Sequence, residues 1–161
     1  MRMGLRSAGT GIVRGWLAGA LTVATLLPGT AWGKGDLTGQ KAIPVLLTLG
    51  TKDNKMEFSP KRLTFETGKL YKLLLVNVSP QTHEFDSTAL SDAVFTHKVE
   101  VVSPQGEEIA EIVGTVREIE VGPGATVEWY FVPIRAVKEG EIVCDLPGHK
   151  EAGMTATFNI Q

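Results

Sequence analysis

The chain has 161 residues, of which 43% are hydrophobic and 21% are charged. This length suits one domain with a substantial core and leaves little room for two. A single cysteine excludes a disulfide scaffold. The formal net charge of −2 argues against a nucleic-acid-binding protein, because such a protein needs a basic surface to displace counterions.

Residues 1–33 have the pattern of a secretory signal peptide. Three arginines and no acidic residue lie in the first fourteen positions, and the apolar run 15–27 follows them. That run is shorter than the roughly 20 residues that a membrane-spanning helix needs. Ala31 and Gly33 are small residues at the −3 and −1 positions of a cleavage site. We therefore predict a cleaved signal, export to the periplasm and a mature domain at 34–161.

The mature segment is predicted to be β-structure from end to end. Short runs rich in apolar and β-branched residues are separated by turn residues about every 8–12 positions, which is typical of an all-β sandwich. The predicted strands are 44–49, 56–58, 63–65, 70–78, 97–102, 107–113, 117–121, 126–132, 141–144 and 155–160. One or two helical turns are predicted within 87–95, with Ser91 and Asp92 as the capping residues. In the triplet 129–131, Trp129 and Phe131 are predicted to face the core.

The cysteine lies in a sequence pattern that suits a metal site. The segment CDLPGHKEAGM places His149 five residues after Cys144, and Met154 five residues after His149. A soft thiolate, an imidazole and a thioether together suit copper, and a trigonal copper site needs one further nitrogen. His83, which follows the most apolar predicted strand, fits that role.

The sequences HEF at 83–85 and CDLPGHKEAGM at 144–154 resemble the copper loops of the cupredoxins, the small blue-copper proteins such as azurin, plastocyanin and auracyanin. The resemblance implies a Greek-key β-sandwich that holds one type 1 copper ion and transfers one electron between Cu(I) and Cu(II). It also implies that His83, Cys144 and His149 are the three equatorial ligands and that Met154 is the axial ligand. Gly148 and Gly153, one before each of the last two ligands, would let the loop bend tightly around the metal.

The sequence departs from the familiar cupredoxins at two positions. Those proteins commonly have Asn after the first histidine and Ser or Thr after the cysteine, where the pair ties the two loops together. Glu84 and Asp145 occupy these positions here. Two facing carboxylates would repel each other unless one holds a proton, so we expect them either to share a proton or to point outward as solvated acids.

The leading functional prediction is an electron carrier and not an enzyme, because four protein ligands leave no open metal position for a substrate. We expect a monomer that docks transiently, near His149, with a redox partner such as a cytochrome or an oxidase, and that binds no small-molecule substrate. The alternative is a periplasmic copper carrier or chaperone that delivers or buffers copper. A third possibility is an accessory β-sandwich with a degenerate site. His97 lacks any ligand spacing to Cys144, and we predict an ordinary strand residue there.

Overall fold

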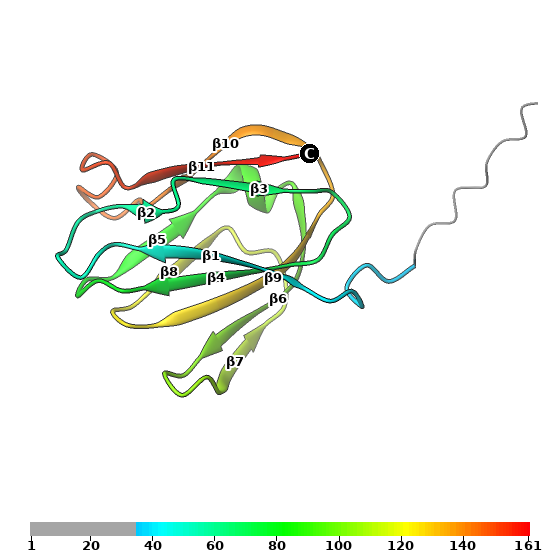
Figure 1. The fold of residues 1–161 in the computed structure, drawn as a ribbon, viewed down its shortest axis with the longest axis horizontal. Helices are drawn as coiled ribbons and strands as arrows, with labels where there is room; N and C mark the ends of the chain where they lie inside the picture. Colours follow the sequence, from blue (N-terminus) through cyan, green and yellow to red (C-terminus); the bar gives the residue numbers. More distant parts are fainter. Residues whose placement is uncertain (1–34) are drawn as a thin grey trace, which may run out of the picture. The chain divides into compact units, whose positions relative to one another are not determined.

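Two β-sheets pack face to face in the computed structural model, which describes residues 35–161 (Figure 1). The predicted signal peptide, its cleavage site and the domain boundary at residue 33 lie outside the described residues, so they stay predictions. No described helix is long and apolar enough to cross a membrane. The strands are β1 (Ile43–Leu49), β2 (Phe58–Ser59), β3 (Arg62–Phe65), β4 (Tyr71–Asn77), β5 (His83–Asp86), β6 (Val94–Val102), β7 (Glu108–Ile112), β8 (Glu118–Val121), β9 (Thr126–Pro133), β10 (Val137–Val143) and β11 (Thr155–Ile160).

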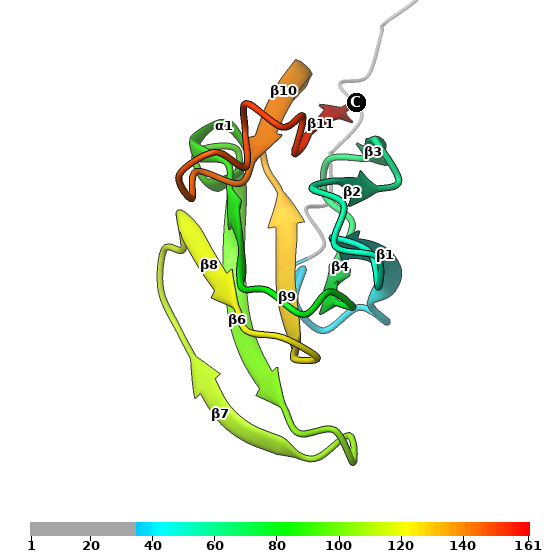
Figure 2. The ribbon, with the colours of Figure 1, turned by 90° about the vertical axis from the view of Figure 1, so that its left-hand side faces the viewer.

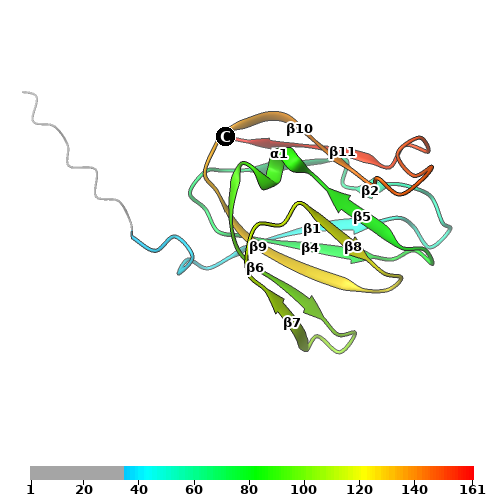
Figure 3. The same cartoon turned by 180° about the vertical axis from the view of Figure 1, so that it is seen from behind.

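Both sheets are mixed, and the chain passes back and forth between them. The six-stranded sheet has the order β2-β1-β4-β9-β6-β7, and the five-stranded sheet has the order β3-β11-β10-β5-β8. The β1–β4 and β3–β11 pairs are parallel, and the other pairs are antiparallel. Between β2 and β6 the chain changes sheet at every strand, so that β2, β4 and β6 lie in one sheet and β3 and β5 lie in the other (Figure 3). The predicted all-β Greek-key sandwich is confirmed, with one short helix.

The core lies between the sheets and follows from the alternation in the strands. In β4 and β9 every second side chain points inward and is buried, because successive side chains of a strand face opposite sides of its sheet. Trp129 and Phe131 are 1% and 0% exposed, as predicted, and Tyr130 between them is only half-buried on the outer face. The hairpin of β6 and β7 projects beyond this core, and every residue of β7 is exposed (Figure 2).

Two local predictions need correction between residues 83 and 95. The strand β5 was not predicted; it buries only His83 and Phe85, and four residues with two acids carry a weak strand signal. The N-cap of the helix α1 (Thr88–Ser91) is Ser87, whose side chain accepts a hydrogen bond from the Leu90 N–H; Asp92 is the C-cap, and Ser91 is the last helical residue. Ser87 also donates to the carbonyl of Glu141 in β10, so a tertiary contact selects this cap.

Gly140 in β10 is predicted to be intolerant of a side chain. A Cβ at this position would lie 2.2 Å from two ring carbons of Phe158, which is fully buried in β11. We expect Gly140→Ala to lower the free energy of unfolding by about 1–3 kcal/mol, because the ring has to move within a packed core. Urea denaturation measures this loss. Gly122→Ala is the matched control, since no atom lies within 4 Å of its added Cβ; equal losses for the two variants would contradict the prediction.

Candidate metal centre

Three donor atoms converge at one end of the sandwich, the end on the left in Figure 1 that faces the viewer in Figure 2. The Nδ1 atom of His149 lies 3.2 Å from the Sγ atom of Cys144 and 3.3 Å from the Nδ1 atom of His83. One donor atom from each of these three residues lies within 4.8 Å of the other two. The structure therefore brings His83 together with Cys144 and His149, which are distant from it in the sequence, as a shared metal ion requires.

Neighbouring strands of the five-stranded sheet place the two buried members of this cluster. His83 is the first residue of β5, and Cys144 directly follows β10. The two strands are antiparallel and pair at Asp86 and Val143, the last residue of each, so the chain after Val143 runs back along β5 toward His83. The amide N–H of Glu84 donates a hydrogen bond to the Cys144 sulfur at 3.3 Å, which links the strands at the site itself.

The loop between β10 and β11 supplies the third member and is closed by its own backbone. The N–H of Met154 donates to the carbonyl of His149 at 3.0 Å, and the N–H of Cys144 donates to the carbonyl of Met154 at 3.2 Å. Gly148 and Gly153 have φ angles of +84° and +96°, a region that side chains rarely adopt. The predicted tight bends at these two glycines are confirmed, and they return the chain to the site.

Burial favours the uncharged forms of the two buried donor residues. Burial lowers the pKa of His83, and the neighbouring His149 lowers it further. Burial also raises the pKa of the Cys144 thiol, while the backbone N–H of Glu84 acts in the opposite direction. A metal ion would favour the thiolate, which is the form that ligates, and the Glu84 N–H is already placed to share its charge.

Met154 is the last residue of the loop between β10 and β11. Its side chain is fully buried and belongs to the core cluster at the same end of the sandwich as Cys144. Its backbone contacts with Cys144 and His149 fix it beside them. The axial role of its sulfur stays a prediction from the resemblance.

The two acids that depart from the familiar pattern have different surroundings. Asp145 is exposed, whereas Glu84 is half-buried in β5. Burial raises the pKa of the Glu84 carboxyl, followed by the negative charges of Glu118 and Glu120. Glu120 lies directly opposite Glu84 in the register of β5 and β8. The exposure of Asp145 thus fits the alternative of a solvated acid. The acids whose negative charge most raises the pKa of Glu84 are on β8.

The donor set suits copper and does not suit the hard cations. Two imidazoles, one thiol that ionises on binding and a nearby thioether are the ligands of trigonal copper sites with a long axial bond. The three converging donor atoms include no carboxylate oxygen. The hard cations calcium and magnesium require oxygen donors, so this centre does not suit them.

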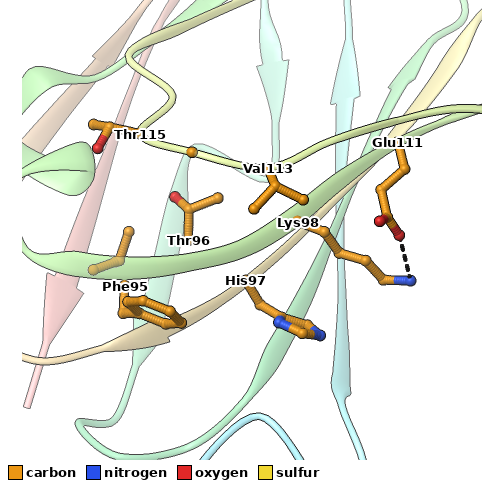
Figure 4. Close-up of a pocket in the computed structure, with 9 residues that line it drawn as sticks. Phe95, Thr96, His97, Lys98, Glu111, Val113 and Thr115 are labelled. Carbon is orange, nitrogen blue, oxygen red and sulfur yellow. Dashed lines mark ion pairs between the residues drawn. The ribbon is translucent and has the colours of Figure 1, made fainter.

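His97 lies elsewhere, in a hollow beside β6 and β7, as the sequence predicted. It is half-buried next to Phe95 and points away from Thr96, while Lys98 pairs with Glu111 farther along the strand (Figure 4). Lys98 also pairs with Glu100. A second group of potential donor atoms lies here, on Glu100, Glu108 and Glu111, and this lysine offsets part of its charge.

The sequence pattern did not predict the residues that contact His83 at Nε2, the ring nitrogen that faces away from the cluster. The Oγ atom of Ser79 lies 2.8 Å from the Nε2 atom of His83, and both side chains are buried. Gly50, at the end of β1, packs against this pair with a φ of +64°. The spacing of Ser79, four residues before His83 in a Ser-Pro turn, was the only local signal for this contact.

Comparison with known proteins gives relatives that carry copper in their names. The chain is 25% identical to the copper-resistant cuproprotein CopI of Pseudomonas aeruginosa over 93% of each chain. It is 29% identical to the protein of the same name from Vibrio cholerae, over 76% of this chain and 68% of that protein. No protein-family model matches.

Solved structures identify the fold. A multicopper oxidase from Campylobacter jejuni superimposes with a TM-score of 0.57 and 13% identity, over 75% of this chain. The chain has the cupredoxin fold. It spans about a third of that oxidase, 30% of its length, so the likeness concerns the fold alone. The predicted resemblance to the cupredoxins is confirmed at this level, and the converging donor atoms lie at one end of this cupredoxin sandwich.

Proposed function

We propose that this chain is an exported copper protein that carries single electrons between redox partners. The observation that carries the proposal is the convergence of His83, Cys144 and His149 at a buried end of a cupredoxin sandwich. A copper ion bound there would supply a one-electron change between Cu(I) and Cu(II). The names of the two CopI relatives support copper as the metal.

The surroundings of the donor atoms favour an electron carrier over an enzyme. His83, Cys144 and Met154 are each 0% exposed, so the protein shields three of its four predicted donors from water. One backbone hydrogen bond joins Cys144 to Met154 and another joins Met154 to His149, which limits movement when the charge of the site changes. With four donors from the chain, no position is left open for a substrate.

His149 offers the route by which a partner would exchange an electron. It is half-buried, whereas the other three predicted ligands are fully buried. Pro147 and Gly148 beside it are exposed and carry no charge. We propose that a redox protein docks transiently on this small surface, as weak redox encounters use small interfaces.

The acidic face next to the site favours a partner with positive charge. In the register of β5 and β8, Glu84 faces Glu120 and Asp86 faces Glu118. Like charges directly opposite each other destabilise a strand pair, so this arrangement has a cost in stability. Such a field speeds the encounter with a basic partner and weakens as salt is added.

The second candidate is a copper carrier that delivers or buffers the metal. The specific observation in its favour is that both named relatives are copper-resistant cuproproteins. The same soft donor set would hold Cu(I) in either case. The two functions differ in whether the metal stays in the protein during a cycle.

The test uses the full chain, expressed with its N-terminal segment and recovered from the periplasm. We expect one copper ion per chain and an intense thiolate-to-copper absorption in the visible range. This absorption should disappear on chemical reduction and return on reoxidation, with no copper released. A colourless Cu(I) protein that gives its metal to an acceptor would favour copper delivery instead, and a protein that binds no copper would reject both candidates.

A further inference from the structure

The hydroxyl of Ser79 has its hydrogen-bonding capacity filled by three contacts. Its Oγ atom lies 2.9 Å from the carbonyl oxygen of Gln81, 3.1 Å from the Gln81 nitrogen and 2.8 Å from the Nε2 atom of His83. Ser79 is 3% exposed and His83 is 0% exposed, so water does not compete for these contacts. A hydroxyl has one proton to donate and two lone pairs to accept with, which matches the three partners.

Counting protons assigns the direction of each contact. The Gln81 carbonyl can only accept, so it takes the single hydroxyl proton, and the Gln81 N–H fills one lone pair. The remaining lone pair faces Nε2 of His83, which therefore has to bring a proton of its own. A neutral imidazole carries a single N–H, so placing that proton on Nε2 leaves Nδ1 without one.

We infer that Ser79 is a positioning residue for the metal centre: its hydroxyl, oriented by Gln81, keeps the proton of His83 on Nε2 and leaves Nδ1 free as the donor atom. The inference rests on the proposed copper site. The Nδ1 atom faces the Nδ1 atom of His149 at 3.3 Å, so the freed lone pair points into the cluster. The site thus has the correct tautomer before a metal ion arrives, and binding requires no proton shift within this ring.

Asn77 and Gly50 hold the serine in this position. The Nδ2 atom of Asn77 donates to the carbonyls of Gln81 at 2.7 Å and of Val121 at 2.8 Å. Its Oδ1 atom accepts the N–H of Ser79 at 2.9 Å. A Cβ at Gly50 would lie 2.5 Å from Nε2 of His83 and 2.6 Å from Cβ of Ser79, so only glycine lets β1 close over this contact. The hydrogen bonds of Asn77 and the close packing of Gly50 therefore fix the position of Ser79.

The test compares Ser79→Ala with the wild type in the full, metal-free protein. Nitrogen-15 chemical shifts of the imidazoles report which ring nitrogen carries the proton. We expect His83 to be protonated on Nε2 in the wild type and to populate the Nδ1-protonated form in Ser79→Ala. Competition with a colorimetric Cu(I) chelator should show affinity reduced about 10–100-fold, the usual cost of losing a partner behind a metal ligand. Ser79→Thr keeps a hydroxyl and should restore the wild-type tautomer.

Ser91→Ala is the matched control, because it removes a buried hydroxyl that donates to the Ser87 carbonyl at 3.0 Å, in α1. It should lower stability without changing the tautomer or the affinity. The inference is overturned if wild-type His83 carries its proton on Nδ1, a measurement that decides the matter even where Ser79→Ala does not fold. It is equally overturned if Ser79→Ala changes neither readout. A wild type with the Nε2 proton that binds no copper would instead refute the proposed function.

Discussion

Replacing Cys144 by alanine is expected to abolish the visible absorption of the copper-loaded protein and to weaken Cu(I) binding by more than about 100-fold, beyond the usual cost of losing an outer partner. The thiolate is the only sulfur anion among the converging donors, and it is the group whose charge transfer to copper produces the colour. Without it, two imidazoles and a thioether would hold the ion with no compensating negative charge. Absorption spectroscopy and chelator competition measure the two effects.

The fold should survive this substitution, so the loss can be assigned to the site. Cys144 is fully buried and its sulfur accepts one amide hydrogen bond, from Glu84. Far-UV circular dichroism of the metal-free variant checks that the sheets are retained. His97→Ala is the control for removing a possible ligand elsewhere, since this histidine lies in β6 outside the cluster, and it should keep full colour. A coloured Cys144→Ala protein would refute both proposed functions.

The core strands were predictable because one face of each strand is buried, and apolar side chains recur at the inward-facing positions. In β9 the alternation of TVEWYFV matches the alternating burial of the strand, and β4 behaves in the same way. Period-two patterns of this kind are set by strand geometry alone. The metal cluster was predictable for a related reason, because two of its three donors lie on one loop with short and fixed spacing.

The parts that could not be predicted depend on contacts between distant segments. The strand β5 is stabilised by pairing with β8 and β10 and carries little apolar signal of its own. The contact of Ser79 with His83 needs Asn77, Gln81 and Gly50 in their folded positions, and none of these residues has a pattern that marks it as part of a site. Sequence spacing identifies the donors, but the hydrogen bonds behind them follow from the tertiary structure.

Trp129→Ala is expected to have the largest effect on stability, lowering the free energy of unfolding by about 3–5 kcal/mol. Trp129 is 1% exposed and lies between aromatic rings of both sheets, with centroids 5.9 Å from Phe85 and 5.0 Å from Phe131. Its Nε1 atom also donates to the hydroxyl of Thr96 at 3.2 Å. Alanine leaves a cavity that these rings cannot fill. Denaturant unfolding, followed by circular dichroism, measures the loss.

Tyr130→Ala is the matched control, because the neighbouring ring lies on the outer face of the same strand and is half-buried. We expect Tyr130→Ala to lower the free energy of unfolding by less than half as much as Trp129→Ala; equal losses would show that the inner face of β9 does not dominate the core.

Trp129→Ala is also expected to affect the metal centre, because Phe85 lies two residues after His83 in β5. If the core positions this strand, Trp129→Ala should weaken Cu(I) binding while Tyr130→Ala should not. Unchanged affinity in a Trp129→Ala protein that still folds would mean that the loops and hydrogen bonds around His83 hold the donors by themselves.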